Sequence, residues 1–204
     1  MMPALATATG HNIWGRPIAV RGRLTNRFNS DVATADTIGI LQRLAHQYAF
    51  DPSVAAANTQ AFAYLGVAPS DRDVACAIFH WLRANIRFVE DETLMYEELG
   101  VAPENLDKEL LIVPPLLLNM PVPMGDCDDF SLLAACMLMN AGVRAYFVTV
   151  AADASEPGRF SHIYVCARLE DENSYMCLDA GNQLVSVPPG WESSNVMRKA
   201  IWAI

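Results

Sequence analysis

Hydrophobic residues recur every three or four positions in the first two thirds of the chain and then alternate with polar residues. The first pattern is typical of helices with one buried face, and the second is typical of strands. We therefore expect helices at about 38–48, 52–65, 70–86 and 127–140, and strands at 144–151, 160–169 and 174–179. Helices followed by antiparallel strands predict an α+β fold, with the last helix packed on a sheet of at least three strands.

The first 34 residues differ from the rest of the chain. Glycines and Pro17 surround a short alternating run at 18–24. This composition predicts an extended arm with one strand and no core of its own. Residues 35–204 are predicted to form one domain.

Composition supports a packed core and excludes two classes of partner. Hydrophobic residues make up 52% of the 204 residues and charged residues 18%, which argues against disorder. The formal charge is −9, from 14 Lys and Arg against 23 Asp and Glu, and it repels nucleic-acid phosphates and anionic lipids. The longest apolar stretch, Leu110 to Leu118, is too short to cross a bilayer and contains two prolines. We expect binding to neither nucleic acid nor membrane.

The N-terminal sequence and the cysteines indicate a reducing compartment. Residues 1–14 lack the positive and continuous apolar regions of a secretory signal, so we expect cytoplasmic synthesis. The five cysteines are odd in number and contain no CxxC pair, which favours free thiols over disulfides or a zinc site. Four of them lie in apolar patterns and are expected in the core: Cys76, Cys136, Cys166 and Cys177.

Residues 90–109 hold eight acidic residues and a single lysine. Such a run is usually solvated, so we expect an exposed connection with short helical turns. Four prolines between 114 and 123 then predict a rigid, irregular approach to the next helix.

The segment Gly125-Asp126-Cys127-Asp128-Asp129-Phe130 places a cysteine in the first turn of a helix. Asp126 is a natural N-cap, with Asp129 three residues later, so Cys127 is expected at about the first helical position. Unpaired N–H groups and the helix dipole favour a thiolate there, and the thiolate is the nucleophilic form of cysteine. Such a nucleophile needs a base and a third group that orients the base.

His162 and Asp179 are the candidates for these two roles. His162 begins one predicted strand and Asp179 ends the next. A hairpin closed by the polar turn 170–173 pairs Leu169 with Ser174. This first pair determines which residues of the two strands face each other along the rest of the hairpin. In that register His162 and Asp179 lie on one sheet face as diagonal neighbours. A slip of one residue would place them on opposite faces.

Three segments in this order resemble the transglutaminase-like core of the papain-like cysteine enzymes. They are GDCDDF at 125–130, FSHIYV at 160–165 and LDA at 178–180. The closest similarity is to small bacterial and phage-encoded members with the signature GDCDD. The resemblance covers about residues 70–190, which are the expected core of the domain.

Carried over residue by residue, the resemblance implies Cys127 as nucleophile, His162 as general acid and base, and Asp179 as its orienting residue. It also implies the fold of that superfamily. The reaction does not follow from it, because the superfamily includes transglutaminases, peptidases, deglycosylating amidases and inactive structural relatives.

The stretch Leu111-Ile112-Val113-Pro114 departs from many small relatives, in which a polar residue, often Gln, precedes the proline and can assist the oxyanion. Backbone N–H groups, above all that of Cys127, are expected to take this role. Asp126, Asp128 and Asp129 flank the nucleophile as in the family signature, and like charge disfavours the thiolate. We expect them to point outward or to cap the helix, where they would select amine-bearing acyl acceptors.

The residues are compatible with two functions of different classes. The first is acyl transfer or amide hydrolysis through a thioester on Cys127, acting on a peptide or protein amide without a cofactor. The second is a catalytically weak or inactive component of a phage or prophage particle, in the tail, baseplate or virion, that binds other virion subunits. The protein would then lie in the host cytoplasm or the virion. The acidic residues beside Cys127 lack the glycine and distal glutamate of a calcium loop, so no metal is expected.

Overall fold

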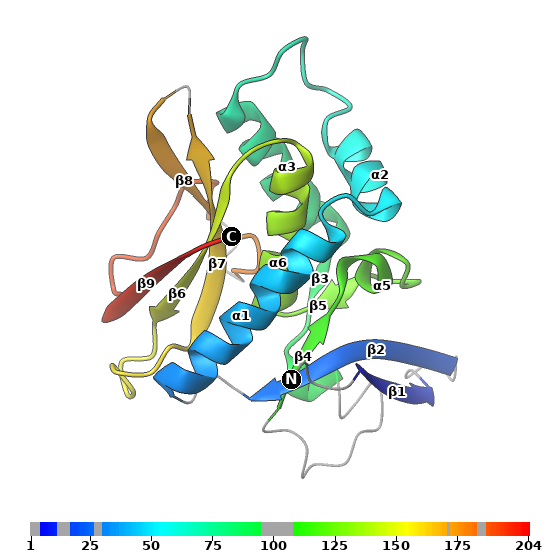
Figure 1. Cartoon of the computed structure of the whole chain (residues 1–204), viewed down its shortest axis with the longest axis vertical. Coiled ribbons are helices and arrows are strands. Elements are labelled where there is room, and N and C mark those ends of the chain that lie inside the picture. Colours follow the sequence, from blue (N-terminus) through cyan, green and yellow to red (C-terminus); the bar gives the residue numbers. More distant parts are fainter. Residues whose placement is uncertain (1–4, 12–16, 27–29, 95–107, 171, 183–186) are drawn as a thin grey trace.

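The computed structural model describes residues 5–11, 17–26, 30–94, 108–170, 172–182 and 187–204 (Figure 1). The helices are α1 (Asp31–Tyr48), α2 (Pro52–Ala61), α3 (Asp71–Asn85), α4 (Asp91–Thr93), α5 (Pro114–Leu118) and α6 (Cys127–Asn140). The strands are β1 (Leu5–His11), β2 (Pro17–Asn26), β3 (Arg87–Phe88), β4 (Lys108–Ile112), β5 (Met124–Gly125), β6 (Ala145–Ala151), β7 (His162–Leu169), β8 (Ser174–Leu178) and β9 (Arg198–Ala203). This arrangement confirms the α+β prediction.

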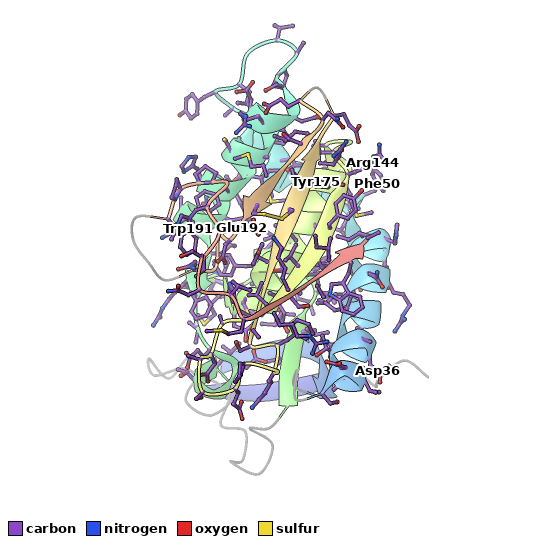
Figure 2. All side chains as sticks on the ribbon, turned by 90° about the vertical axis from the view of Figure 1, so that its left-hand side faces the viewer. Asp36, Phe50, Arg144, Tyr175, Trp191 and Glu192 are labelled. Atoms are coloured by element: carbon purple, nitrogen blue, oxygen red, sulfur yellow. A yellow bond between two sulfur atoms is a disulfide. The ribbon has the colours of Figure 1, made fainter. Side chains whose placement is uncertain are left out.

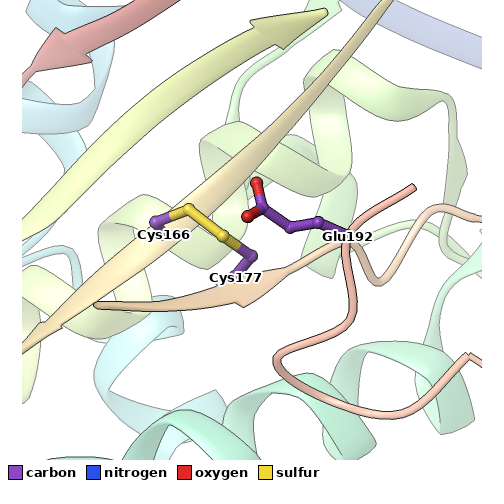
Figure 3. A group of neighbouring side chains, drawn as sticks. All are labelled: Cys166, Cys177 and Glu192. Atoms are coloured by element: carbon purple, nitrogen blue, oxygen red, sulfur yellow. A yellow bond between two sulfur atoms is a disulfide. The ribbon is translucent and has the colours of Figure 1, made fainter. Parts of the chain in front are cut away.

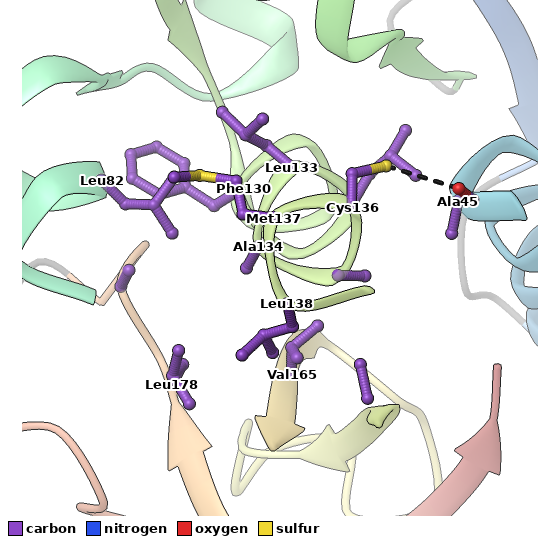
Figure 4. Close-up of a cluster of buried hydrophobic side chains, with 14 of the residues drawn as sticks. Ala45, Leu82, Phe130, Leu133, Ala134, Cys136, Met137, Leu138, Val165 and Leu178 are labelled. Atoms are coloured by element: carbon purple, nitrogen blue, oxygen red, sulfur yellow. Dashed lines mark hydrogen bonds between the residues drawn. The ribbon is translucent and has the colours of Figure 1, made fainter. Parts of the chain in front are cut away.

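Helix α6 lies at the centre of the molecule and is enclosed by other elements (Figure 4). Every residue from Asp128 to Leu138 is buried. Leu82 of α3 and Val165 of β7 belong to the same apolar cluster as these residues. An apolar sequence on all faces is typical of a fully buried helix. The predicted helix at 127–140 and its packing on the sheet are therefore confirmed.

Helix α6 ends where the sequence predicts, before Gly142. Gly142 has φ +81° and its N–H donates to Met139 O at 3.1 Å, while Val143 N–H donates to Leu138 O at 2.9 Å. These two bonds define a Schellman motif, in which glycine adopts the left-handed conformation without a steric penalty.

The main sheet has the strand order β8-β7-β6-β9 and is antiparallel throughout. The β7–β8 hairpin has the predicted register, with Leu169 paired to Ser174 and Val165 paired to Leu178. Asn173 in the turn has φ +49°, a conformation that asparagine tolerates better than most residues.

The N-terminal arm contains two strands instead of the single one expected. Strand β2 covers the predicted run at 18–24, and it pairs with both β1 and β4. Helix α1 begins at Asp31, with the Ser30 side chain accepting a hydrogen bond from Ala33 N, so it starts before the predicted domain boundary. The division into an arm and a domain stays a prediction.

Helix α3 begins with a capping box, in which Ser70 Oγ accepts from Asp73 N and the Asp73 carboxylate accepts from Ser70 N. Helix α2 begins at Pro52 as expected, but it ends at Ala61 and not at Leu65. After Ala61 the Tyr64 side chain is exposed, while Phe62 and Leu65 are partly buried against the main core. Within the described part of the chain, no helix combines the length and hydropathy needed to cross a membrane.

The acidic segment is not simply a solvated connection. Asp91 is only 1% exposed, and its carboxylate accepts a hydrogen bond from Leu110 N. Residues 95–107 of this segment lie outside the described residues. Strand β4 begins at the end of this segment. Helix α5 covers Pro114–Leu118, where an irregular approach was expected, and residues 119–123 have no regular structure, as expected.

A disulfide joins Cys166 of β7 to Cys177 of β8 (Figure 3), so the expectation of free thiols at these positions is wrong. The two residues are direct cross-strand partners and are 5% and 6% exposed. They pack with Val148, Val150 and Tyr164 in a small apolar cluster separate from the main core. The predicted hairpin register places Cys166 and Cys177 opposite each other. The odd number of cysteines nevertheless favoured free thiols over a disulfide.

We expect replacement of both Cys166 and Cys177 by alanine to lower the free energy of unfolding by about 3 kcal/mol under oxidising conditions. The cross-link closes a loop between residues 11 apart and so restricts the unfolded chain. Urea unfolding with and without a reducing agent measures this effect. The reducing agent should destabilise the wild type and leave the double variant unchanged, with Cys76→Ala responding as the wild type does. A wild type insensitive to reduction would contradict the prediction.

Candidate active site

Cys127 is the first residue of α6 and follows β5 by one residue. Strand β5 pairs with β3, and Val89 N donates to Gly125 O at 2.9 Å. Asp126 caps the helix, and its carboxylate accepts a hydrogen bond from Asp128 N at 3.1 Å. The Cys127 side chain is half-buried. Strand pairing and the cap thus hold this thiol at one end of the buried helix.

Two contacts bring the end of the β7–β8 hairpin to Cys127. Ser131 Oγ lies within hydrogen-bond distance of both Cys127 O, at 2.6 Å, and Ile163 O, at 3.2 Å. A Cβ placed on Gly181 would lie 3.5 Å from Cys127 Cα. Ile163 is the neighbour of His162, and Gly181 follows β8 closely in the chain. The first turn of α6 therefore contacts the two segments that carry the candidate partners of the cysteine.

His162 and Asp179 form a hydrogen-bonded pair, with Nε2 of His162 2.8 Å from Oδ1 of Asp179. Asp179 is buried and His162 is half-buried. An ionised carboxylate only accepts hydrogen bonds, so Nε2 is the donor and Nδ1 is the nitrogen that can exchange a proton with another group. The structure brings the two residues together, while their catalytic roles stay predictions.

The sequence did not reveal how the second oxygen of Asp179 is held. Asn182 Nδ2 donates to Asp179 Oδ2 at 3.0 Å, and Arg83 of α3 donates from Nη1 to Asn182 O at 3.1 Å. Asn182 lies three residues after Asp179, a spacing typical of local turns that could have identified it. Arg83 lies 99 residues earlier in the chain than Asn182 and carries no local signal.

A comparison with known families identifies the family of the chain. A family model described as a transglutaminase-like domain matches residues 61–196, which is more than half of the chain. The chain belongs to this family. The resemblance to the transglutaminase-like superfamily is thereby confirmed, and the phage type within it stays an expectation.

Two solved structures are similar to this transglutaminase-like chain. One is described as a crystal structure of a TGase, with 17% identity and a TM-score of 0.42, covering 81% of this chain and 37% of that chain. The other is described as "a Putative Cysteine Protease from Cytophaga hutchinsonii", with 12% identity and a TM-score of 0.41, covering 98% of this chain and 72% of that chain. The chain thus spans little more than a third of the TGase. A comparison with curated proteins found no match.

Tyr164 lies beside the histidine of this transglutaminase-like domain. Its ring centroid is 6.1 Å from that of His162, and its hydroxyl donates to Glu192 Oε1 at 2.5 Å. Lys199 forms an ion pair with the same carboxylate. Burial raises the pKa of the Tyr164 phenol, and the bond to Glu192 raises it further. Glu192 and its neighbour Trp191 lie on the segment after β8 (Figure 2), which packs on this side of the sheet.

The carboxylates beside Cys127 do not point outward as expected. Asp126, Asp128 and Asp129 are 8%, 1% and 1% exposed. Asp129 Oδ1 accepts a hydrogen bond from Ile112 N at 2.7 Å, and a Cβ on Gly125 would clash with its carboxylate. Only Asp126 has the predicted capping role. The selection of cationic or amine-bearing acyl acceptors by these residues stays a prediction.

Two groups of described residues have ligand atoms close enough together for a metal ion. Carboxylate oxygens of Asp91, Asp126 and Asp129 lie within 4.8 Å of one another, and such oxygens are the ligands that Ca²⁺ and Mg²⁺ prefer. The second group contains Cys166 and Cys177, whose sulfurs are already joined by the disulfide. The absence of a metal stays a prediction.

The Asp128 carboxyl is buried among other carboxylates. Burial raises its pKa well above the usual range, and the charges of Asp126, Asp129 and Asp91 raise it further. Neither of its oxygens has a hydrogen-bond donor among the described residues. A buried carboxyl without a cationic partner is more stable protonated than ionised.

The remaining cysteines differ from Cys127 in their surroundings. Cys136 is fully buried on α6 and its Sγ lies 3.7 Å from Ala45 O, so burial raises the pKa of its thiol (Figure 4). Burial also raises the pKa of the half-buried Cys76 thiol, and Asp73 contributes in the same direction. These two thiols therefore serve as unreactive references.

We expect Asp128→Asn to stabilise the protein increasingly as the pH rises. The folded pKa of Asp128 lies above the unfolded value of about 4, so its contribution to stability is present below pH 4 and is lost as the pH rises through the folded pKa. A carboxamide does not ionise and avoids this loss. The difference in unfolding free energy between variant and wild type should grow by up to about 1.4 kcal/mol per pH unit above pH 4.

Urea unfolding of both proteins between pH 4 and pH 8 measures this difference. Asp36→Asn removes an exposed carboxylate of α1 and is the matched control. Parallel pH profiles for wild type and Asp128→Asn would show that Asp128 is ionised in the folded protein and would contradict the prediction.

Proposed function

We propose that this chain is a cysteine-dependent enzyme that transfers or hydrolyses acyl groups of peptide or protein amides. Cys127 is the nucleophile, His162 the general acid and base, and Asp179 the residue that orients His162. The observation that carries the proposal is the 2.8 Å hydrogen bond between His162 and Asp179 next to the first turn of α6. A base that is oriented by a carboxylate beside a cysteine at a helix N-terminus is the arrangement that nucleophilic catalysis requires.

The first half of the reaction forms a thioester. The Cys127 thiol transfers its proton to Nδ1 of His162, and its sulfur attacks the amide carbonyl carbon. The tetrahedral intermediate breaks its C–N bond, and the imidazolium gives the proton to the leaving amine. Asp179 holds Nε2–H and so stabilises the imidazolium without accepting its proton.

The second half regenerates the enzyme. Water or a second amine loses a proton to His162 and attacks the thioester, and the C–S bond breaks to release Cys127. Water gives an acid, so the chain would be a peptidase or amidase, whereas an amine gives a new amide, so it would be a transglutaminase. Both outcomes use the same residues, and the acyl acceptor decides between them.

The oxyanion of the intermediate needs hydrogen-bond donors. The apolar stretch before Pro114, where many small relatives have a polar residue, is buried: Leu111, Ile112 and Val113. Their side chains therefore offer no donor to a substrate. The positive end of the α6 dipole, at Cys127, supports stabilisation of the oxyanion by backbone N–H groups.

The structural alternative, a virion component without chemistry, makes the opposite prediction about Cys127. An inert cysteine reacts with alkylating agents no faster than other thiols of similar exposure. A catalytic cysteine reacts faster because the neighbouring imidazole takes its proton. Reactivity at Cys127 therefore discriminates between the two functions.

With limiting iodoacetamide at pH 6, we expect Cys127 to react at least about tenfold faster than Cys76. At this pH an ordinary thiol is almost entirely protonated. His162→Ala should remove most of the advantage of Cys127, because the proton acceptor is lost. Peptide mass spectrometry gives the rate at each free cysteine.

His80→Ala is the matched control, since it removes an exposed imidazole from α3 and should leave the rate at Cys127 unchanged. Equal rates at Cys127 and Cys76 would refute the enzyme proposal and favour a structural role. An undiminished rate in His162→Ala would refute the role of His162 as the base.

A further inference from the structure

Tyr164 lies against the His162–Asp179 pair and plays no part in the proposed proton transfers. It follows His162 by two residues on β7, so both side chains lie on the same face of the strand. The two ring centroids are 6.1 Å apart and the ring planes are inclined at 40°, within the usual range of aromatic pairs. Burial and the bond to Glu192 raise the pKa of the Tyr164 phenol, and the charge of Asp179 adds to this effect. The tyrosine is therefore close to both members of the pair.

The Tyr164 side chain is fixed at both ends. Its ring is only 5% exposed and packs in the small apolar cluster that contains Val148, Val150 and the disulfide. Its hydroxyl donates to Glu192 Oε1 at 2.5 Å. A buried aromatic ring with a hydrogen bond at its polar end is held in one orientation.

Glu192 is also held in place beside the sheet (Figure 3). Gly190 N donates to a carbonyl of β8 at 2.7 Å, and Met197 N donates to a carbonyl of β6 at 3.0 Å, so the segment is attached on both sides of Glu192. Lys199 of β9 forms an ion pair with the carboxylate. Burial opposes ionisation of Glu192, but the bonds from Lys199 and Tyr164 outweigh it and lower the pKa of this carboxyl. The phenol thus has a fixed and negatively charged acceptor.

The proposed chemistry makes two demands on His162 that its bond to Asp179 does not meet alone. A single hydrogen bond at Nε2 permits the imidazole to turn about that bond, whereas Nδ1 must stay directed toward Cys127. The packed ring of Tyr164 restricts this rotation. In addition, the first proton transfer produces an imidazolium, and an aromatic ring about 6 Å away attracts a cation. A hydrogen bond from the phenol to a carboxylate increases the electron density of the ring and so strengthens this attraction.

We propose that Tyr164 is a positioning residue of this site, held by Glu192, that keeps the His162 ring oriented and stabilises its imidazolium form. The inference rests on the proposed function and adds two residues to it. Tyr164 acts through His162 and is not itself a catalytic residue. Its consequence is that the pair of Cys127 thiolate and His162 imidazolium forms at a lower pH than it would without the tyrosine.

Charged groups on other elements also act on His162. Asp179 follows β8, Glu192 lies on the next segment, and the Cys127 thiolate lies on α6. Lys199 of β9 lies in the same cross-strand row as His162, with one residue of β6 between them. The three anionic groups favour the imidazolium and Lys199 opposes it. A test of Tyr164 must therefore separate the effect of the ring from the effect of these charges.

The experiment follows alkylation of Cys127 by iodoacetamide from pH 4 to pH 9, with peptide mass spectrometry as the readout. The midpoint of the rate profile reports formation of the thiolate–imidazolium pair. We expect Tyr164→Leu to raise this midpoint by about one pH unit, because the cation loses the neighbouring ring. Tyr164→Phe keeps the ring and should recover more than half of the shift. Tyr175→Leu makes the same change at an exposed tyrosine of β8 and should leave the midpoint unchanged.

Glu192→Gln tests the second residue without removing a buried ring. Glutamine keeps an acceptor for the phenol but loses the charge. We expect the midpoint to rise by about half a pH unit in the wild-type background, and by at most half as much in the Tyr164→Phe background, where no hydroxyl remains. Glu170→Gln, at an exposed glutamate paired with Arg144, is the matched control and should have no effect.

A midpoint in Tyr164→Leu equal to that of the wild type would overturn the positioning role while Cys127 stays reactive. Equal shifts for Glu192→Gln in both backgrounds would show that Glu192 acts on His162 directly and would overturn its action through Tyr164. This second comparison decides alone if Tyr164→Leu does not fold. Alkylation of Cys127 no faster than that of Cys76 in the wild type would instead overturn the proposed function, and the positioning role with it.

Discussion

The complete burial of α6 is the constraint on which the rest of the structure depends. Its residues from Asp128 to Leu138 have no exposed face, so only the ends of the helix can take part in chemistry. The C-terminal end is closed by a Schellman motif at Gly142. The N-terminal end carries Cys127 and the positive end of the helix dipole. The apolar core thus determines where a nucleophile can be both rigidly held and accessible.

The same burial explains the acidic residues around the cysteine. Asp126, Asp129 and Asp91 each accept a backbone hydrogen bond, from the first turn of α6 and from β4. These bonds offset part of the cost of removing carboxylates from water. They also tie the end of α6 to the strand beside it. Asp126 and Asp129 therefore act as supports for the helix N-terminus.

Local patterns predicted most of what lies within single elements. The cap at Asp126 and the hairpin register from Leu169 and Ser174 are visible in short segments, because capping and turn geometry involve neighbouring residues. Contacts between distant segments left no such signal. The burial of Asp91 depends on β4, and the position of Arg83 depends on a loop 99 residues away. The acidic composition of residues 90–109 placed Asp91 in solvent, and no sequence pattern gave Arg83 a role.

The disulfide joins β7 to β8 in the register that brings His162 and Asp179 together. Cys166 and Cys177 are direct partners on β7 and β8, four residues after His162 and two residues before Asp179. A slip of one residue would move the side chains of one strand to the other face, separating both the cysteines and the His162–Asp179 pair. The cross-link therefore excludes the one local rearrangement that would dismantle the pair without unfolding the domain. A covalent bond between the two strands thus supports the register that places His162 and Asp179 within hydrogen-bond distance.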